Sequence, residues 1–185
     1  MATSSVMMPL GTQAPDFALT DVVTGHTISR DDYADATALL VMFICNHCPY
    51  VKHVAPQLAA LGRDYLDSDV AMVAINSNDP EQYPEDSPSA MMAEATIRGY
   101  RFPYLFDDTQ DVARAYTAAC TPDFFLFGPE RTLVYRGRLD QSRPDSGIPV
   151  TGDDLRAAIE AVRAGEPVGD EQYPSMGCSI KYRAG

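Results

Sequence analysis

Lysine is almost absent from this chain of 185 residues. Lys52 and Lys181 are the only lysines, and 14 lysines and arginines face 26 acidic residues, for a formal net charge of −12 at pH 7. The sequence pI is about 4.4. Such a chain repels a phosphate backbone and offers no basic cluster to an anionic lipid surface. The composition therefore argues against nucleic acid and against a membrane surface as partners.

Long hydrophobic runs are also missing. No stretch approaches the roughly 18 consecutive apolar residues that indicate a transmembrane helix. Residues 1–10 lack the charged start and the long apolar centre of a secretion signal. We therefore expect a soluble, cytoplasmic protein. In that setting the four cysteines indicate chemistry rather than a framework of structural disulfides.

The chain alternates between strand and helix patterns. Residues 11–33 predict an N-terminal hairpin, the apolar run 38–44 a buried strand, and Thr151 the capped start of the last helix. A helix after the buried strand is indicated by apolar spacings of three and four at Val51, Val54, Leu58, Leu61 and Tyr65. Further elements are predicted over residues 70–75, 87–98, 102–106, 107–116, 124–127 and 132–139.

This alternation indicates one α/β domain over residues 1–185, with a mixed central sheet, helices on both faces and the N-terminal hairpin at its edge. We expect residues 1–10 to be flexible and residues 166–185 to form a C-terminal tail packed on the domain.

The most informative segment is Cys45-Asn46-His47-Cys48, between the predicted strand and the predicted helix. A cysteine beside a helix N-terminus meets unpaired N–H groups and the positive end of the helix dipole, which favour the thiolate. Two cysteines at this spacing can also close into a disulfide. We therefore predict a redox dithiol in which Cys45 is the attacking thiolate, more acidic and more exposed, and Cys48 is the resolving thiol.

Several further motifs accompany this pair. They are Ala14-Pro15-Asp16-Phe17, Ala74-Ile75-Asn76-Ser77-Asn78-Asp79, Phe102-Pro103-Tyr104-Leu105, Cys120-Thr121-Pro122-Asp123 and Gly177-Cys178-Ser179-Ile180-Lys181. With Cys45-Asn46-His47-Cys48-Pro49-Tyr50-Val51-Lys52, they resemble the thioredoxin-like superfamily, its alkyl hydroperoxide reductase/thiol-specific antioxidant (redoxin) branch, and within it a peroxiredoxin-like subgroup. The resemblance implies a thioredoxin-like fold. It also implies that Pro122 is cis and that Thr121 presents its backbone to a docking substrate.

The chain departs from these relatives in two places. Thioredoxins carry a buried acid on the strand before the first cysteine, whereas residues 38–44 contain none. Peroxiredoxins place Thr or Ser three residues before the peroxidatic cysteine, but here Cys45 precedes Cys48 at that spacing and Met42 precedes Cys45. For a peroxidase, Arg136 or Arg138 could still supply a guanidinium.

His47 resembles the intervening histidine of strongly oxidising disulfide-forming proteins, which stabilises the first thiolate. The alternative is an exposed imidazole with no coupling to sulfur. Zinc or an iron–sulfur cluster is a further alternative, with ligands from Cys45, Cys48, Cys120, Cys178, His47 or His53, but the chain has no second pair at ligand spacing. We expect no metal and no cofactor.

Cys120 and Cys178 are possible auxiliary thiols. Cys120 could equally be a small buried residue, whereas Cys178 lies in a polar, glycine-containing tail with little core to fill. Its partner could be the Cys45/Cys48 pair or Cys120, and we expect it to lie closer to Cys120 than to Cys45 because the pair already has its own resolving thiol.

These observations predict a thiol–disulfide oxidoreductase with an antioxidant or redox-homeostasis role. Its partners would be protein or small-molecule thiols and disulfides. A thiol-dependent hydroperoxide reductase and a redox-inert binding or metal protein are the alternatives. The sequence indicates no oligomeric state, physiological substrate or electron donor.

Overall fold

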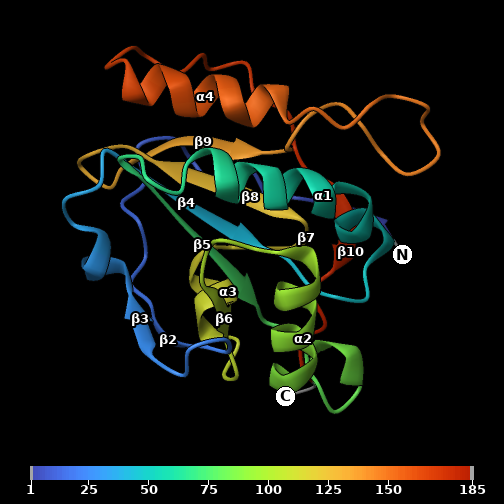
Figure 1. Ribbon diagram of the computed structural model, residues 1–185. Helices are drawn as coiled ribbons and strands as arrows, with labels where there is room; N and C mark the ends of the chain where they lie inside the picture. The colour runs from blue at the N-terminus through green and yellow to red at the C-terminus, as the bar shows by residue number, and fades with distance from the viewer. Residues whose placement is uncertain (1, 184–185) are drawn as a thin grey trace.

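The computed structural model describes residues 2–183 and contains a seven-stranded mixed sheet (Figure 1). In sheet order the strands are β3 (Thr27–Ser29), β2 (Ala18–Asp21), β6 (Tyr104–Phe106), β5 (Val70–Asn76), β4 (Ala38–Phe43), β8 (Asp123–Phe127) and β9 (Leu133–Gly137). β4, β5 and β6 run parallel, and all other neighbours are antiparallel. The mixed sheet and the predicted N-terminal hairpin, formed by β2 and β3, are confirmed.

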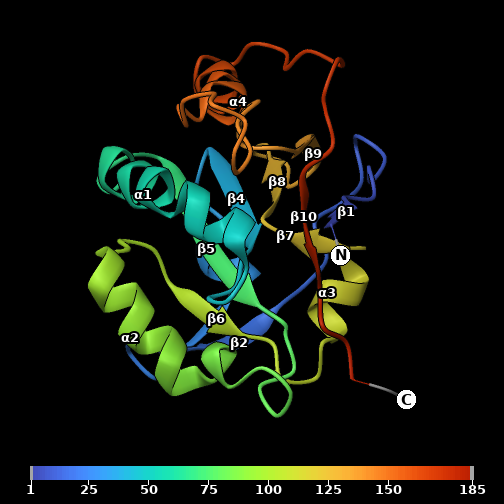
Figure 2. The ribbon, with the colours of Figure 1, turned by 90° about the vertical axis from the view of Figure 1, so that its right-hand side faces the viewer.

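Helices cover both faces of this sheet. α1 (Pro49–Asp64), α2 (Pro88–Arg98) and α4 (Asp153–Arg163) contribute to one buried cluster, and α3 (Asp111–Ala115) contributes to the other. Figure 2 shows α1 and α2 on one side of the strands and α3 on the opposite side. Two short 3-10 turns, η1 (Arg30–Tyr33) and η2 (Pro84–Asp86), complete the regular structure. No helix between residues 2 and 183 has the length and apolar character needed to cross a membrane.

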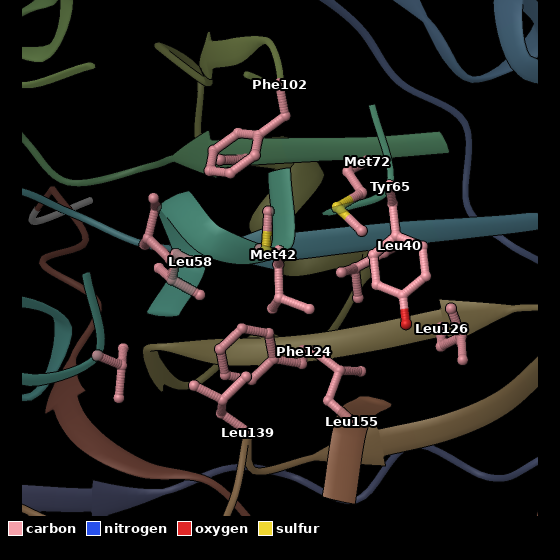
Figure 3. Close-up of a cluster of buried hydrophobic side chains, with 14 of the residues drawn as sticks. Leu40, Met42, Leu58, Tyr65, Met72, Phe102, Phe124, Leu126, Leu139 and Leu155 are labelled. Atoms are coloured by element: carbon pink, nitrogen blue, oxygen red, sulfur yellow. The ribbon is translucent and has the colours of Figure 1, made fainter. Parts of the chain in front are cut away.

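Both faces of β4 are buried, which explains its unbroken apolar run. Because successive strand residues point to opposite faces, Leu40 and Met42 join the cluster under α1 and α4, whereas Phe43 joins the cluster near α3. Figure 3 shows Leu40 and Met42 with Leu58 of α1 and Leu155 of α4. Burial of each such side chain contributes about 1.5–3 kcal/mol. The packed strand therefore gives the loop that follows it a rigid base.

The helix boundaries follow capping chemistry. α1 starts with proline at its first position, and Cys48 is its N-cap. α2 begins after Ser87, whose hydroxyl accepts from Ala90 N, and it ends at Gly99 in the left-handed region.

The capped start predicted at Thr151 is wrong by one residue. Gly152, with φ +75°, is the N-cap of α4 and makes no side-chain cap. Instead the Asp140 carboxylate accepts from the backbone N–H groups of Thr151 and Gly152, at 2.8 and 2.7 Å. The Thr151 hydroxyl accepts from Asp153 N at 3.3 Å, so it still bonds the first N–H of the helix from one residue before the N-cap.

A second sheet of three strands joins the two ends of the chain. Its order is β1 (Ala2–Ser4), β10 (Met176–Ser179) and β7 (Cys120–Thr121), with antiparallel pairing throughout. Residues 2–4 are therefore paired, contrary to the flexibility expected of residues 1–10. Their partner strand lies in the C-terminal tail, so no local sequence pattern indicated it. Figure 2 shows β10 between β1 and β7.

Candidate redox site

Cys45 and Cys48 lie at the carboxyl end of β4, in the turn that leads into α1. Both are free thiols, and both are buried, with 2% and 0% of their surface exposed. The expected exposure of Cys45 is therefore not observed. The buried β4 and the buried face of α1 hold the turn on both sides, which fixes the two sulfurs relative to the sheet.

The Thr121–Pro122 peptide bond lies against this turn and is cis, as the family resemblance implied. Cys45 Sγ is 3.2 Å from Thr121 Oγ1, and Cys48 Sγ is 3.3 Å from the Thr121 carbonyl oxygen. Thr121 itself is buried. One residue thus contacts both sulfurs, through its side chain and its backbone.

The acidity of the two thiols is the reverse of the sequence prediction. A hydrogen bond from Cys45 lowers the pKa of Cys48 to about 4; burial opposes this shift, and Cys178 and the Val51 N–H add to it. The contact with the Thr121 carbonyl favours the thiol form of Cys48, but the hydrogen bonds that Cys48 accepts have the larger effect on its pKa. The same bond to Cys48, followed by burial and the Asp86 charge, raises the pKa of Cys45 well above its ordinary value.

The start of α1 adds to the effect of the hydrogen bond between the two sulfurs. Because the helix begins at Pro49, its free N–H groups and dipole act on the N-cap Cys48 rather than on Cys45, three residues earlier. Pro49 was the signal in the sequence, since proline favours the first helical position. The bond between the two sulfurs and the helix start both favour a thiolate on Cys48 over one on Cys45.

Asp86 is a site residue that the sequence reasoning missed. It is fully buried in η2, and each of its oxygens accepts two hydrogen bonds. The donors are Asn46 N at 2.7 Å, Asn76 Nδ2 at 3.2 Å, Asn78 Nδ2 at 2.8 Å and His47 Nδ1 at 2.5 Å. Burial alone would raise the pKa of Asp86, but bonds from His47, Asn46 and Asn78 lower it overall. Nothing near residue 86 in the sequence marks this role, because the donors come from two other loops.

His47 is oriented by Asp86 and Tyr83. Its Nδ1 bonds to the carboxylate, and its ring stacks on Tyr83 with centroids 4.7 Å apart. Its side chain is only 16% exposed, so the alternative of a freely exposed imidazole is wrong. Among residues 2–183 the hydrogen bond of this ring goes to a carboxylate and not to sulfur. Stabilisation of a thiolate by His47 stays a prediction.

Cys178 lies beside the Cys45/Cys48 pair, not beside Cys120. In the antiparallel pairing of β10 with β7, Cys178 is opposite Thr121 and Ser179 is opposite Cys120. Directly opposed residues share a face, so Cys178 and Cys120 point to opposite faces of the small sheet. This register contradicts the expected pairing of Cys178 with Cys120, and it could not be read from the sequence.

Cys120 and Cys178 also differ in their surroundings. Cys120 is fully buried, and burial together with Asp123 raises its pKa strongly. Cys178 is partly exposed, and burial followed by its bond with Cys48 raises its pKa to about 11. Cys120 is thus a buried packing residue in this structure, whereas Cys178 contacts the redox pair.

The residues that could hold a metal are Cys45, His47 and Asp86, whose ligand atoms lie within 4.8 Å of one another. Both carboxylate oxygens of Asp86 already accept two donors each, so a cation would have to displace some of them. His53 instead lies 3.2 Å from Ser142 Oγ and is not in this group.

The two arginines considered for a peroxidase are engaged elsewhere. Arg136 donates to the Met8 carbonyl and to Gln172, and Arg138 pairs with Asp154 at 2.6 Å. In the described part of the chain neither guanidinium bonds to a cysteine.

Comparison with known proteins places the chain in a family. The model of the AhpC/TSA family matches residues 10–136, and the chain belongs to this family of thioredoxin-like proteins. The solved structures confirm the α/β thioredoxin-like fold with its mixed central sheet and helices. The finer likeness to a peroxiredoxin-like subgroup stays a prediction. Among curated proteins no relative matches the chain.

Three solved structures illustrate the range of similarity. An uncharacterized conserved protein from Geobacillus kaustophilus is 55% identical, with a TM-score of 0.98 over 100% of this chain and 98% of its own. A hypothetical protein from Sinorhizobium meliloti 1021 is 50% identical, with a TM-score of 0.97 over 99% and 100%. A secreted disulfide oxidoreductase from Mycobacterium tuberculosis shares the fold at 16% identity, with a TM-score of 0.62 over 78% and 95%.

Proposed function

We propose that this protein is a thiol–disulfide oxidoreductase whose Cys45 and Cys48 cycle between a dithiol and a disulfide. The observation that carries the proposal is the position of Cys48, at the N-cap of α1, with a second thiol three residues earlier and Thr121 contacting both sulfurs. A thiolate and a resolving thiol are the parts that thiol–disulfide exchange requires.

The cysteine that favours the thiolate is assigned the attacking role, and the cysteine that keeps its proton is assigned the resolving role. The Cys48 thiolate attacks one sulfur of an incoming disulfide, so that a mixed disulfide forms and the first substrate sulfur leaves. Cys45 then attacks Cys48 Sγ, and the second substrate sulfur leaves as the Cys45–Cys48 disulfide forms. The Cys45 proton ends on a departing sulfur. The pair loses two electrons and the substrate disulfide gains them. The attacking and resolving roles are thus exchanged relative to the sequence prediction.

Hydroperoxide reduction is supported less well by the site. A peroxidatic thiolate needs donors for the peroxide oxygens, and both Arg136 and Arg138 are bonded to other groups. The low pKa of Cys48 fits either chemistry, so it does not separate them. A paired assay separates disulfide reduction from peroxide reduction. It measures the loss of glutathione disulfide and the loss of hydrogen peroxide with the same reduced protein.

The test of the proposal is the disulfide itself. Trypsin releases Cys45 and Cys48 together in residues 31–52, Cys120 in 115–131 and Cys178 in 164–181. After equilibration with glutathione buffers, the wild type should yield residues 31–52 lighter by two hydrogen atoms, with one midpoint potential. Cys45→Ser and Cys48→Ser should both lose this species, whereas Cys120→Ser should keep it. A wild-type protein that never forms this linkage would refute the proposed function.

A further inference from the structure

The strand β10 occupies the edge beside the cis proline. It pairs antiparallel with β7, and Cys178 is directly opposite Thr121, the residue that contacts both sulfurs of the redox pair. Figure 2 shows β10 passing directly beside β7. A substrate strand that docked on Thr121 would need the backbone groups that β10 already uses. The chain therefore places its own cysteine where a docked strand would present one.

The fit of this strand is close. A Cβ atom on Gly177 would lie 1.9 Å from the Thr121 carbonyl oxygen, so only glycine allows the approach. Cys178 packs against the cluster that contains Cys45 and Cys48, and the tail strand also contacts α1. β1 pairs with the other edge of β10. The position of Cys178 is thus set by pairing on both sides of its strand.

Cys178 is more exposed to solvent than either cysteine of the redox pair, so it can react first with an external molecule. Cys45 and Cys48 are 2% and 0% exposed, whereas Cys178 is the one cysteine of the four that is not fully buried. An external disulfide therefore meets Cys178 before it meets the thiolate. Because β10 blocks docking of a substrate strand, the external partner that fits is a small thiol or disulfide.

We infer that Cys178 is a third exchange thiol. It forms a mixed disulfide with a small external molecule and is then attacked by Cys48. The inference rests on the proposed function of the Cys45/Cys48 pair. In the first step Cys178 gives up its proton to water and its thiolate attacks one substrate sulfur; the substrate S–S bond breaks, and the other substrate sulfur leaves and takes up a proton.

Two further steps return Cys178 to its starting state. The Cys48 thiolate attacks Cys178 Sγ, a Cys48–Cys178 bond forms, and the second substrate sulfur leaves and takes a proton from water. Cys45 then attacks Cys48 Sγ, the Cys48–Cys178 bond breaks, and the Cys45 proton ends on Cys178. The net reaction oxidises only the Cys45/Cys48 pair and reduces one substrate disulfide.

The test traps the intermediate. Reduced Cys45→Ser protein treated with glutathione disulfide should accumulate a disulfide between residues 31–52 and 164–181. The reason is that Cys45, the thiol that attacks in the third step, is absent. The matched Cys48→Ser protein should stop one step earlier, with glutathione on Cys178 and no such linkage. Glutathione found on Cys48 of Cys45→Ser, without the linkage to 164–181, would overturn the inference.

A second measurement uses proteins that keep the redox pair intact. Oxidation of residues 31–52 by glutathione disulfide should be several-fold slower in Cys178→Ser than in wild type. It should be unchanged in Cys120→Ser, whose sulfur lies on the other face of the small sheet. Equal rates in the two variants would refute the relay while leaving the proposed function standing. No Cys45–Cys48 disulfide in any of them would refute the proposed function instead.

Discussion

The hydrogen bond from Cys45 is the first cause of the low pKa of Cys48, and its removal should be measurable. We predict that Cys45→Ala raises the pKa of Cys48, because the thiolate loses its neutral donor. A hydrogen bond to a charged group contributes about 1.5–3 kcal/mol. One pKa unit corresponds to about 1.4 kcal/mol, so the pKa should rise by roughly one to two units from its wild-type value of about 4.

Cys45→Ser is the matched control, because a serine hydroxyl can donate the same bond. In this variant the pKa of Cys48 should stay close to that of the wild type. Both variants leave Cys48 as the only cysteine in residues 31–52. Cys178 and Cys120 are released in other peptides, and burial keeps the pKa of each above its ordinary value.

The assay is the rate of iodoacetamide alkylation of residues 31–52 against pH. Burial slows the reaction at every pH, but the midpoint of the profile reports the pKa of Cys48. The reasoning fails if the alanine and serine variants share one midpoint. It also fails if the wild-type midpoint lies near the ordinary thiol value of about 8.5.

Three further predictions concern the surroundings of the pair. Asp86→Asn should lower the unfolding free energy by about 3 kcal/mol in urea titrations, since it breaks a buried charged network, whereas exposed Glu85→Gln should change it little. Gly177→Ala should displace β10 and speed alkylation of residues 164–181, whereas Gly169→Ala, with open space at its Cβ, should not. The folded pKa of Cys48 lies below its unfolded value, so the thiolate adds to the stability of the reduced wild type relative to Cys48→Ser. This difference in unfolding free energy should be largest above about pH 8.5 and should shrink as the pH falls toward about 4. A difference that grows toward low pH would contradict the assigned thiolate.

Local patterns predicted the elements that build the site. The apolar run before Cys45 forms β4, and the spacing that begins at Val51 forms α1. Ser87 and Gly99 bound α2 because a hydroxyl N-cap and a left-handed glycine act within one turn of the helix. Such features depend on neighbours in the sequence, so the sequence alone was enough to place them.

Features that depend on long-range pairing could not be predicted. The partners of β10 are residues 2–4 and residues 120–121, and their register decides which cysteine meets which. The donors to Asp86 come from the turn after β4 and the loop after β5, so its burial and charge follow from tertiary packing. The acidity order could have been predicted: Pro49 already indicated the start of α1, but the prediction treated Cys45 as the cysteine just before the helix.

Cys45 must lose its proton when it resolves a mixed disulfide, and the geometry limits the acceptors for that proton. Thioredoxins use a buried acid for such a transfer, and the buried acid nearest in the sheet here is Asp123, directly opposite Phe43. Phe43 packs in the cluster near α3, so Asp123 faces away from the cluster that contains Cys45 and Cys48. Burial also raises the pKa of Asp123. Asp86 is ionised, but four donors already occupy its oxygens. A sulfur that leaves as a thiolate can take this proton itself, so that the proton and the S–S bond move in the same step of exchange.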